Sequence, residues 1–231
     1  MRINNLSFKF DKNGPDFFKD LTVEFAPNQV HFIQGDNGIG KSTLFNILQG
    51  NIEHDAQLDA SVTLDGTTYK AHNNTFDTRF TNQIHTVQQN YNRMIADQFT
   101  FKENLQLANL PSHPGLHSLP KATIFDVMQS FGADIVNTPA HSLSGGQRQL
   151  LAILMSAQKS TRMLLLDEPT ATLDTENAKM IIECLQQLAV ELKVTMLIIC
   201  HDKELVKKYS DHNCYVLEKN SDGQRLIKFE S

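Results

Sequence analysis

A glycine-rich segment near the start of the chain has the residue types and the spacing needed to bind phosphate. Residues 35–43 read GDNGIGKST, which satisfies the pattern GxxxxGK followed by Ser or Thr. Glycines let backbone N–H groups converge on phosphate oxygens, because no Cβ atom stands in the way. Lys41 would add a positive charge beside the β- and γ-phosphates, and the hydroxyl of Ser42 would bind Mg²⁺. The pattern predicts nucleotide contacts from Gly35, Asn37, Gly38, Gly40, Lys41, Ser42 and Thr43.

Two adjacent carboxylates follow an apolar run later in the chain. Residues 163–168 read MLLLDE, so a buried strand would deliver Asp167 and Glu168 at its carboxyl end, where ligands of parallel sheets bind. Asp167 would orient Mg²⁺ through a water molecule. Glu168 is placed to act as the general base on the water that attacks the γ-phosphate, a role worth about 10² to 10⁴ in rate. A solvated acidic strand end is the alternative, and the phosphate loop in the same chain argues against it.

The segments around these residues have the patterns of the elements that must position them. Residues 30–34 form a short β-branched run that ends at the glycine-rich segment, and residues 43–48 have the spacing of a helix's buried stripe. This order of strand, turn and helix is the context that a phosphate loop requires. Residues 162–167 and 194–200 are strand-like segments built on apolar runs, with a helical stretch, residues 177–192, between them. They predict a buried, mostly parallel sheet flanked by helices, which is an α/β fold.

Other stretches predict an antiparallel part and a helical part. Apolar and polar residues alternate in residues 3–10 and 21–25, which indicates antiparallel strands. Asp65 and Gly66, a dipeptide that suits a two-residue turn, lie between two short strand-like runs and predict a hairpin. From about residue 90 to 155 the pattern is helical and is interrupted by four prolines, so this stretch is expected to form a separate helical subdomain.

The composition restricts the classes of protein to consider. The chain has 231 residues, a net charge of −5 and no block of basic residues, which argues against a nucleic-acid-binding or lipid-surface protein. The longest apolar runs, residues 163–166 and 196–200, are far shorter than the roughly 18 residues that a membrane span needs. Three widely spaced cysteines, and an opening segment without a secretory pattern, favour reduced thiols and a cytoplasmic location.

A third motif, residues 143–147, reads LSGGQ and precedes the acidic strand. This sequence is the signature of ATP-binding-cassette (ABC) ATPases, and the chain resembles the nucleotide-binding domains of that family along essentially its whole length. The motifs occur in the family's order: phosphate loop, glutamine after a strand, signature, acidic strand, the segment ATLD, and a histidine after the last core strand. The resemblance implies one domain over residues 1–231, with a P-loop NTPase (RecA-like) core plus an antiparallel β subdomain at about 1–89 and 156–231, and a helical subdomain at about 90–155.

The resemblance assigns roles to further residues. Phe10 stands where family members carry an aromatic residue that stacks on adenine; an ordinary core residue at a strand end is the alternative. Gln89 or its neighbour Gln88, with Gln89 favoured, would contact Mg²⁺ and the attacking water, and the alternative is an ordinary loop amide. His201 would contact the γ-phosphate and steady the same water, and Asp174 would cross a dimer interface.

The signature has the chemistry of an anion site. Ser144, Gly145 and Gly146 open a helix, so a hydroxyl and unobstructed N–H groups are available, and Gln147 completes the motif. The phosphate loop already gives the chain one anion site, so a second one would serve a pair of chains. In the family, two copies pair head to tail, and the signature of each copy closes the ATP site of the other. Ser144 would also serve as an ordinary helix cap. The expected ligands are ATP and Mg²⁺, and the expected partner is a second ABC ATPase subunit in a homodimer.

Two functions fit this family. The favoured one is the ATP-hydrolysing subunit of an ABC transporter, peripheral on the inner face of the cell membrane, which energises solute transport by separate membrane permease subunits. The alternative is a soluble ABC ATPase that acts on a protein or nucleic-acid assembly, for example in iron–sulfur cluster assembly. The sequence has no coiled coil, second cassette or basic arm, which counts against the alternative and against direct contact with nucleic acid. The helix after the signature weakly resembles that of bacterial importers for amino-acid-like solutes.

Overall fold

Two β-sheets form the framework of the computed structural model, which describes residues 1–87, 91–108, 110, 133–157, 160–210, 213–221 and 223–230. An antiparallel sheet has the strand order β2-β1-β4-β5, and a larger sheet has the order β10-β9-β3-β8-β7-β6. The first sheet contains β1 (Arg2–Lys9), β2 (Phe18–Glu24), β4 (Gln57–Leu64) and β5 (Thr67–Lys70). The second contains β3 (Val30–Gln34), β6 (Ile84–Val87), β7 (Met163–Asp167), β8 (Thr195–Ile199), β9 (Cys214–Lys219) and β10 (Arg225–Glu230). The mixed α/β fold class predicted from the sequence is confirmed.

The antiparallel sheet has the pairing that the alternating segments predict. Strand β1 pairs antiparallel with β2 and with β4. Strands β4 and β5 form the predicted hairpin, with Leu64 opposite Thr67 and positive φ angles of 47° at Asp65 and 78° at Gly66. Both turn residues therefore have the left-handed backbone that this kind of two-residue turn requires.

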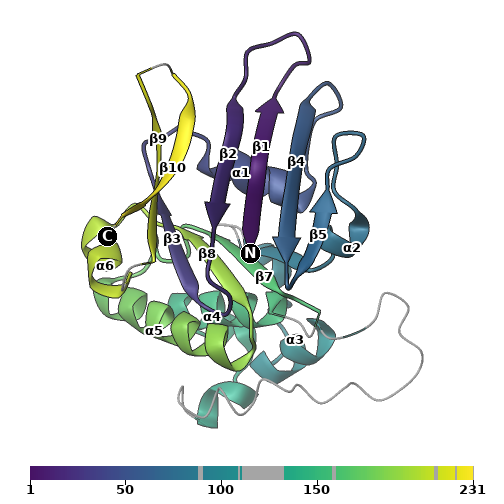
Figure 1. Ribbon diagram of the computed structural model, residues 1–231. Coiled ribbons are helices and arrows are strands. Elements are labelled where there is room, and N and C mark those ends of the chain that lie inside the picture. The colour runs from purple at the N-terminus through teal and green to yellow at the C-terminus, as the bar shows by residue number, and fades with distance from the viewer. Residues whose placement is uncertain are drawn as a thin grey trace.

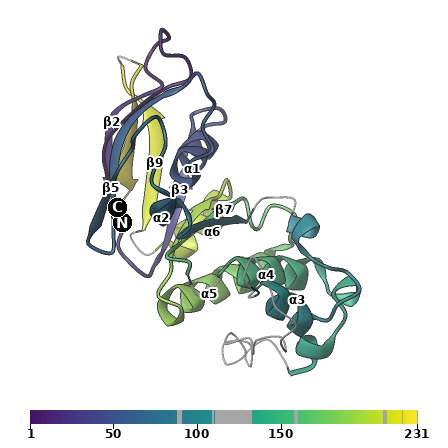
Figure 2. The same cartoon turned by 90° about the vertical axis from the view of Figure 1, so that its right-hand side faces the viewer.

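The helices cover the faces of the larger sheet (Figures 1 and 2). The α-helices are α1 (Lys41–Gln49), α2 (Thr78–Thr81), α3 (Phe101–Ala108), α4 (Gly145–Ser156), α5 (Thr175–Glu191) and α6 (Lys203–Tyr209). Short 3-10 helices are η1 (Tyr91–Met94), η4 (Ala133–Asn137) and η5 (Ala140–Ser142). Helix α1 lies between the two sheets and shares a core with both, whereas α4 and α5 pack on the opposite face of the larger sheet. No helix within the described ranges is both long enough and apolar enough to cross a membrane.

The continuous apolar runs are strands buried on both faces. In β7, Met163 and Leu165 pack in the core that contains α1, and Leu164 and Leu166 pack in the core that contains α4 and α5. Strand β8 alternates in the same way between the two cores. The pairs β6–β7, β7–β8 and β3–β8 are all parallel. Because side chains of successive residues point to opposite faces, a strand covered on both sides needs an apolar residue at every position.

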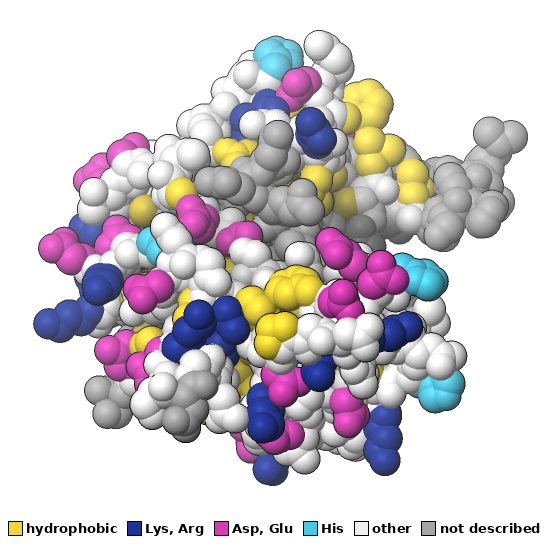
Figure 3. Space-filling model, turned by 90° about the horizontal axis from the view of Figure 1, so that it is seen from above, with side chains coloured by type: hydrophobic (Ala, Val, Ile, Leu, Met, Phe, Trp, Pro, Cys, Tyr) yellow, Lys and Arg dark blue, Asp and Glu magenta, His cyan; other side chains and the backbone are white. Residues whose placement is uncertain are grey.

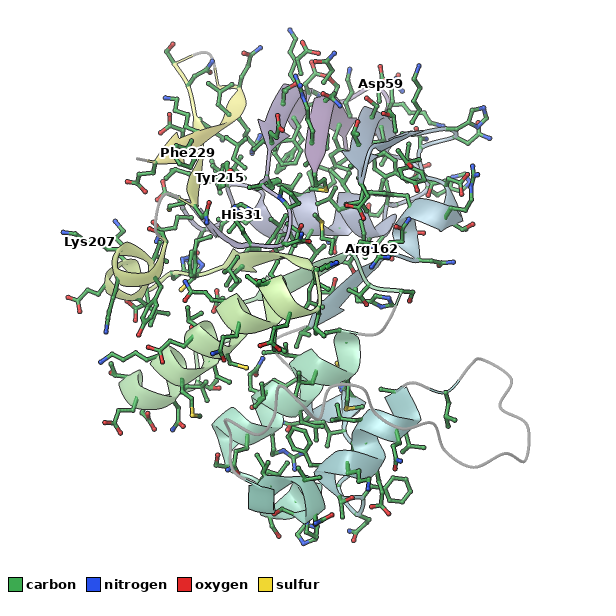
Figure 4. All side chains as sticks on the ribbon, turned by 60° about the horizontal axis from the view of Figure 1, so that its bottom comes forward. His31, Asp59, Arg162, Lys207, Tyr215 and Phe229 are labelled. Carbon is green, nitrogen blue, oxygen red and sulfur yellow. The ribbon has the colours of Figure 1, made fainter. Side chains whose placement is uncertain are left out.

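A final hairpin closes the larger sheet. Strand β9 pairs parallel with β3 and antiparallel with β10, which is the edge strand. The sequence patterns predict no element after residue 200, so α6, β9 and β10 are additions from the structure. Strand β10 reads RLIKFE, and its residues are only half-buried or exposed. Its neighbour contributes Tyr215, whose ring lies beside buried His31 and, on its other side, Phe229 (Figure 4).

The described part of the stretch from about residue 90 to 155 is mostly helical, with turns and one antiparallel bridge, between Thr100 and Pro139, joining the helices. It contains η1, α3, η4, η5 and α4, and α3 packs against α4. In Figure 2 these elements lie to one side of the larger sheet, away from the antiparallel sheet. Of the four prolines in this stretch, Pro139 caps η5, and the others lie outside the described residues. The division into subdomains at about residues 90 and 155 stays a prediction.

Candidate nucleotide-binding site

The glycine-rich segment connects β3 to α1 as a tight loop. Gly35, Gly38 and Gly40 have φ angles of 143°, 74° and 118°, which side chains rarely tolerate. A Cβ atom on Gly35 would collide with the carbonyl oxygen of Leu217, and one on Gly40 would lie 2.7 Å from Cε1 of Phe17. Glycine is therefore needed at both ends of the loop, for conformation and for space.

Lys41 is held inside this loop. Its Nζ atom donates hydrogen bonds to the carbonyl oxygens of Gly35, at 2.7 Å, and Asp36, at 3.0 Å. Burial lowers the pKa of Lys41, while the charges of Glu168 and Asp167 oppose that shift. The ammonium group therefore sits between the loop and the acidic strand end, where it supplies positive charge to an anion bound by the loop.

Ser42 and Asp167 place two oxygen ligands side by side. Asp167 ends β7, and its carboxylate accepts a hydrogen bond from the side chain of Ser42. Burial, followed by the charge of Glu168, raises the pKa of Asp167. A hydroxyl and a carboxylate in a site with unfavourable negative charge suit a hard divalent cation that prefers oxygen ligands. These residues therefore fit Mg²⁺.

Glu168 follows in an unusual backbone conformation. Its φ angle is 51°, in the left-handed region, which is uncommon for a residue with a side chain and costs of order 1–3 kcal/mol. Its N–H group donates to the carbonyl oxygen of Ile199 at 3.0 Å, so the neighbouring strand β8 holds this turn in place. Such strain often occurs at functional sites.

His201 lies beside Glu168 at the carboxyl end of the sheet. Its Nε2 atom lies 3.1 Å from Oε1 of Glu168, within hydrogen-bond distance. Both side chains are partly exposed, at 43% for His201 and 32% for Glu168, so a water molecule and a phosphate group have access to them. The carboxylate can accept a proton from water, and the imidazole can orient that carboxylate or the phosphate.

One cavity of about 200 Å³ brings most of the predicted site residues together. It is lined by Asn37, Gly38, Gly40, Lys41, Ser42, Thr43, Asp167, Glu168, Ile199 and His201. Gly35 instead lines a neighbouring cavity of about 860 Å³, which shares Asn37 and His201 with the first. The described residues of the cavity thus combine a phosphate loop, a metal-binding pair and a base. Gln88 and Gln89 lie outside the described residues, so their roles stay predictions.

Phe10 lies close to the phosphate loop, with its ring available to a ligand. It is 47% exposed, and its ring contacts those of Phe8 and Phe17 edge-on, with centroids 5.0 Å and 4.7 Å away. A buried core role does not fit this exposure. The accessible ring supports the predicted stacking on adenine, for which an aromatic face is sufficient.

The signature forms the start of α4. The Ser144 hydroxyl accepts a hydrogen bond from the N–H of Gln147 at 3.3 Å, and the Gln147 side chain accepts one from the N–H of Ser144 at 3.0 Å. This reciprocal capping confirms the predicted cap. A Cβ atom on Gly146 would lie 3.2 Å from Oδ1 of Asn177, whereas the space beside Gly145 is nearly open. The described residues that line the phosphate cavity include none from the signature.

Asp174 also caps a helix. Its carboxylate accepts hydrogen bonds from the N–H of Asn177, at 2.8 Å, and from the Asn177 side chain, at 2.7 Å. These bonds lower the pKa of Asp174. The residue is exposed, which leaves it accessible to a second chain, and its place in a dimer interface stays a prediction.

Comparison with known proteins agrees with this geometry. Residues 18–171 match the family model described as ABC transporter. The chain belongs to the ABC transporter family. As an ABC ATPase it binds ATP and hydrolyses it, and the described phosphate cavity holds the groups for both steps.

Relatives of this ABC ATPase are named as ATP-binding proteins of transporters. It is 30% identical to a tyrosine transport ATP-binding protein of Clostridioides difficile (strain R20291), with 91% of this chain and 86% of that protein covered. It is also 30% identical to the phosphonates import ATP-binding protein PhnC 1 of Ruegeria sp. (strain TM1040), covering 91% of this chain and 83% of that protein.

Solved structures show the same fold. An ATP-binding cassette of an ABC transporter, MJ1267 in its ADP conformation, matches with a TM-score of 0.73 and 23% identity, covering 99% of this chain and 90% of that one. The structure of cbiO1 from Clostridium perfringens matches with a TM-score of 0.74 and 22% identity, covering 97% and 85%. Both matches cover the P-loop core and the helical region of this ABC ATPase.

Sequence patterns missed some residues that contact the phosphate loop. Leu217 of β9 and Phe17, next to β2, press against its two ends, and Arg225 of β10 binds its backbone. Nothing marks these residues in the sequence, because their proximity depends on how the last hairpin packs on the antiparallel sheet. A phenylalanine pair at the start of a strand looks like ordinary core sequence.

Proposed function

We propose that this chain powers solute transport by separate membrane subunits through ATP-driven pairing of two copies. The supporting observation is that the phosphate loop, Asp167, Glu168 and His201 meet in one cavity while the signature lies outside it. A complete ATP site then needs the signature of another copy. The names of relatives, which include import of phosphonates and of methionine, favour a small organic solute and the direction of import.

The chain's own residues account for the hydrolytic step. Lys41 and the loop N–H groups bind the phosphates, and Glu168 accepts a proton as water attacks the γ-phosphate. His201, 3.1 Å from Glu168, keeps that carboxylate oriented toward the water. Mg²⁺, held by Ser42 and Asp167 with Gln89 as a further predicted ligand, would neutralise charge on the phosphate oxygens.

The second copy would pair head to tail with the first. In this arrangement the N–H groups at the start of α4, with the Ser144 hydroxyl, would face the γ-phosphate in the partner's loop. Asp174 would lie in the same interface. A related cassette, MJ0796, has been solved as a dimer in a post-hydrolysis state with ADP and Pi, with a TM-score of 0.65 and 21% identity to this chain. That fold similarity is compatible with the same mode of pairing.

The helical region offers a surface for the permease. Met94, at the end of η1, is 39% exposed and Phe99, before α3, is 43% exposed, so two large apolar side chains face outward in this region. We place the membrane subunit here, which makes the chain peripheral on the inner face of the cell membrane.

Positive and negative side chains are interspersed on the face shown in Figure 3, which favours a protein partner over nucleic acid.

A co-purification experiment tests this function. Tagged protein extracted in mild detergent should retain a polytopic membrane protein, and Phe99→Glu should lose it while still binding ATP. Val190→Glu adds the same charge at a position on α5 that is 65% exposed, and it should retain the membrane protein. Retention of only a non-membrane assembly, unaffected by Phe99→Glu, would favour the alternative function.

A further inference from the structure

The last hairpin of the chain contacts the phosphate loop at both ends of the loop. In β9, the carbonyl oxygen of Leu217 fills the space beside Gly35. In β10, the Nε atom of Arg225 donates a hydrogen bond to the carbonyl oxygen of Ile39 at 2.7 Å. Figure 1 shows this hairpin beside β2, on the side of the sheet where the loop lies. The hairpin therefore supports the backbone of the phosphate loop at two points.

Arg225 connects the loop to a second segment as well. Its Nη1 atom donates to the carbonyl oxygen of Phe17 at 3.0 Å, and its Cζ atom lies 3.6 Å from the centroid of the Phe17 ring. A guanidinium group over an aromatic face is favourable, and the planar fork matches two carbonyl acceptors at once. Among the described residues, no carboxylate lies within ion-pair distance of Arg225. Its acceptors here are backbone carbonyls.

The loop needs these donors because of how it binds phosphate. When its N–H groups converge on an anion, its carbonyl groups turn outward and require other partners. Lys41 binds the carbonyl oxygens of Gly35 and Asp36 at the start of the loop. Arg225 binds that of Ile39 near its end. The two cations thus hold the two ends of the loop.

Phe17 extends this contact to the surface predicted to bind the base. Its ring is so close to Gly40 that a Cβ atom there would lie 2.7 Å from Cε1. The same ring packs edge-on against Phe10, with centroids 4.7 Å apart. A shift of Phe17 would therefore move the phosphate loop and the Phe10 ring relative to each other.

We propose that Arg225 is a positioning residue for the nucleotide, which fixes the end of the phosphate loop and the Phe10–Phe17 pair in one geometry. Arg225 does not itself reach the reacting atoms. Its effect is on binding, because a triphosphate and its base must be engaged at the same time. This role rests on the ATP site already described, and it is independent of the identity of any transport partner.

Nucleotide binding and steady-state kinetics of Arg225 variants test the proposal. Arg225→Ala should raise the Kd for a non-hydrolysable ATP analogue, and the KM for ATP, by about tenfold, because two charge-assisted hydrogen bonds are lost. The kcat should change by less than about twofold, since Glu168 and His201 do not contact Arg225. Arg225→Lys should recover little of the affinity, because an ammonium group lacks the planar fork. Lys228→Ala removes a cation from the same strand that pairs with Glu218, and it should bind as the wild type does.

Three results would show that Arg225 does not position the nucleotide. Unchanged affinity in Arg225→Ala, full recovery in Arg225→Lys, or a fall in kcat without a change in KM would overturn the proposal. If Arg225→Ala does not fold, Phe17→Leu takes its place, because this change removes the ring and keeps the backbone acceptors. It should weaken binding of the analogue several-fold, and normal binding would again overturn the proposal. The unfolding midpoint without nucleotide, measured for every variant, separates lost stability from lost positioning.

Discussion

The Nε2 atom of His201 lies 3.1 Å from Oε1 of Glu168, and the two residues follow the ends of neighbouring strands, β8 and β7. They meet because α5 crosses over the sheet and returns the chain parallel to β7, so both strand ends reach the same edge. The same edge holds the phosphate loop after β3. The topology of the sheet thus brings together Glu168, His201 and the phosphate loop, which belong to three distant segments of the chain.

Replacing the proposed base should stop hydrolysis without preventing binding. Glu168→Gln keeps the shape and a hydrogen bond to His201 but cannot accept a proton, so phosphate release should slow by about 10² to 10⁴. Affinity for ATP should stay close to that of the wild type. Glu218→Gln, at a partly exposed position on β9, is the matched control and should keep full activity. If Glu168→Gln retained most of its turnover, another group would have to be the base.

Removing the loop cation should weaken binding itself. Lys41→Ala deletes a charge that faces phosphate before and during the reaction, so ATP affinity should fall by about 2 kcal/mol, which is roughly 30-fold. Isothermal titration calorimetry measures this directly. Lys228→Ala serves as the control for loss of a cation elsewhere. Equal affinity in Lys41→Ala and the wild type would remove Lys41 from the phosphate site.

The role of Phe10 is separable from that of the loop. Stacking of a base on an aromatic ring contributes about 1–3 kcal/mol, so Phe10→Ala should weaken ATP binding roughly tenfold and leave binding of inorganic triphosphate unchanged. Phe10→Tyr keeps the ring and should bind ATP normally. An equal loss for ATP and for triphosphate would show that Phe10 acts through packing near the loop and makes no contact with the base.

Stability should decrease in mild acid because of His31. This residue is fully buried, its Nε2 atom hydrogen-bonds to the carbonyl oxygen of Ala26 at 2.8 Å, and its Nδ1 atom has no partner. Burial lowers the pKa of His31 below its ordinary value of 6.5, so the folded protein holds the neutral ring. The unfolded chain binds the proton more readily, so the contribution of His31 is complete above pH 6.5 and declines as the pH falls toward the lowered folded value.

Urea unfolding at several pH values checks this dependence. His85, whose pKa burial also lowers, acts in the same direction, so the informative quantity is the difference between the wild type and His31→Gln. The free energy of unfolding of the wild type should fall more steeply between about pH 7 and pH 5 than that of His31→Gln. Parallel curves would mean that His31 is not a source of the acid sensitivity.

Most of the site was predictable because its residues lie in strong local patterns. The phosphate loop, Asp167 and Glu168 are contiguous with the strands that present them, so residue spacing alone places them at one sheet edge. The apolar runs of β7 and β8 identify strands buried on both faces. His201 and Ser144 needed the family resemblance, since a lone histidine or a capping serine has many ordinary explanations.

Other features depend on contacts between distant segments. The strained φ angle of Glu168 is held by a hydrogen bond to Ile199, on another strand, and no local sequence pattern predicts it. Strand β10 is a half-exposed edge without a clear alternation, so neither the strand nor Arg225 within it stood out. The contact of Arg225 with Ile39 joins residues from opposite ends of the chain, which only the packed fold brings together.

The central claim is that one chain's phosphate loop works with another chain's signature, and mixing two inactive variants tests it most directly. Lys41→Ala disables the loop, and Ser144→Arg blocks the signature. A mixed dimer contains one site in which both halves are intact, so combining the two purified variants should restore ATP hydrolysis well above the sum of their separate rates. Activity that never exceeds that sum, at protein concentrations where the wild type is active, would contradict a shared site.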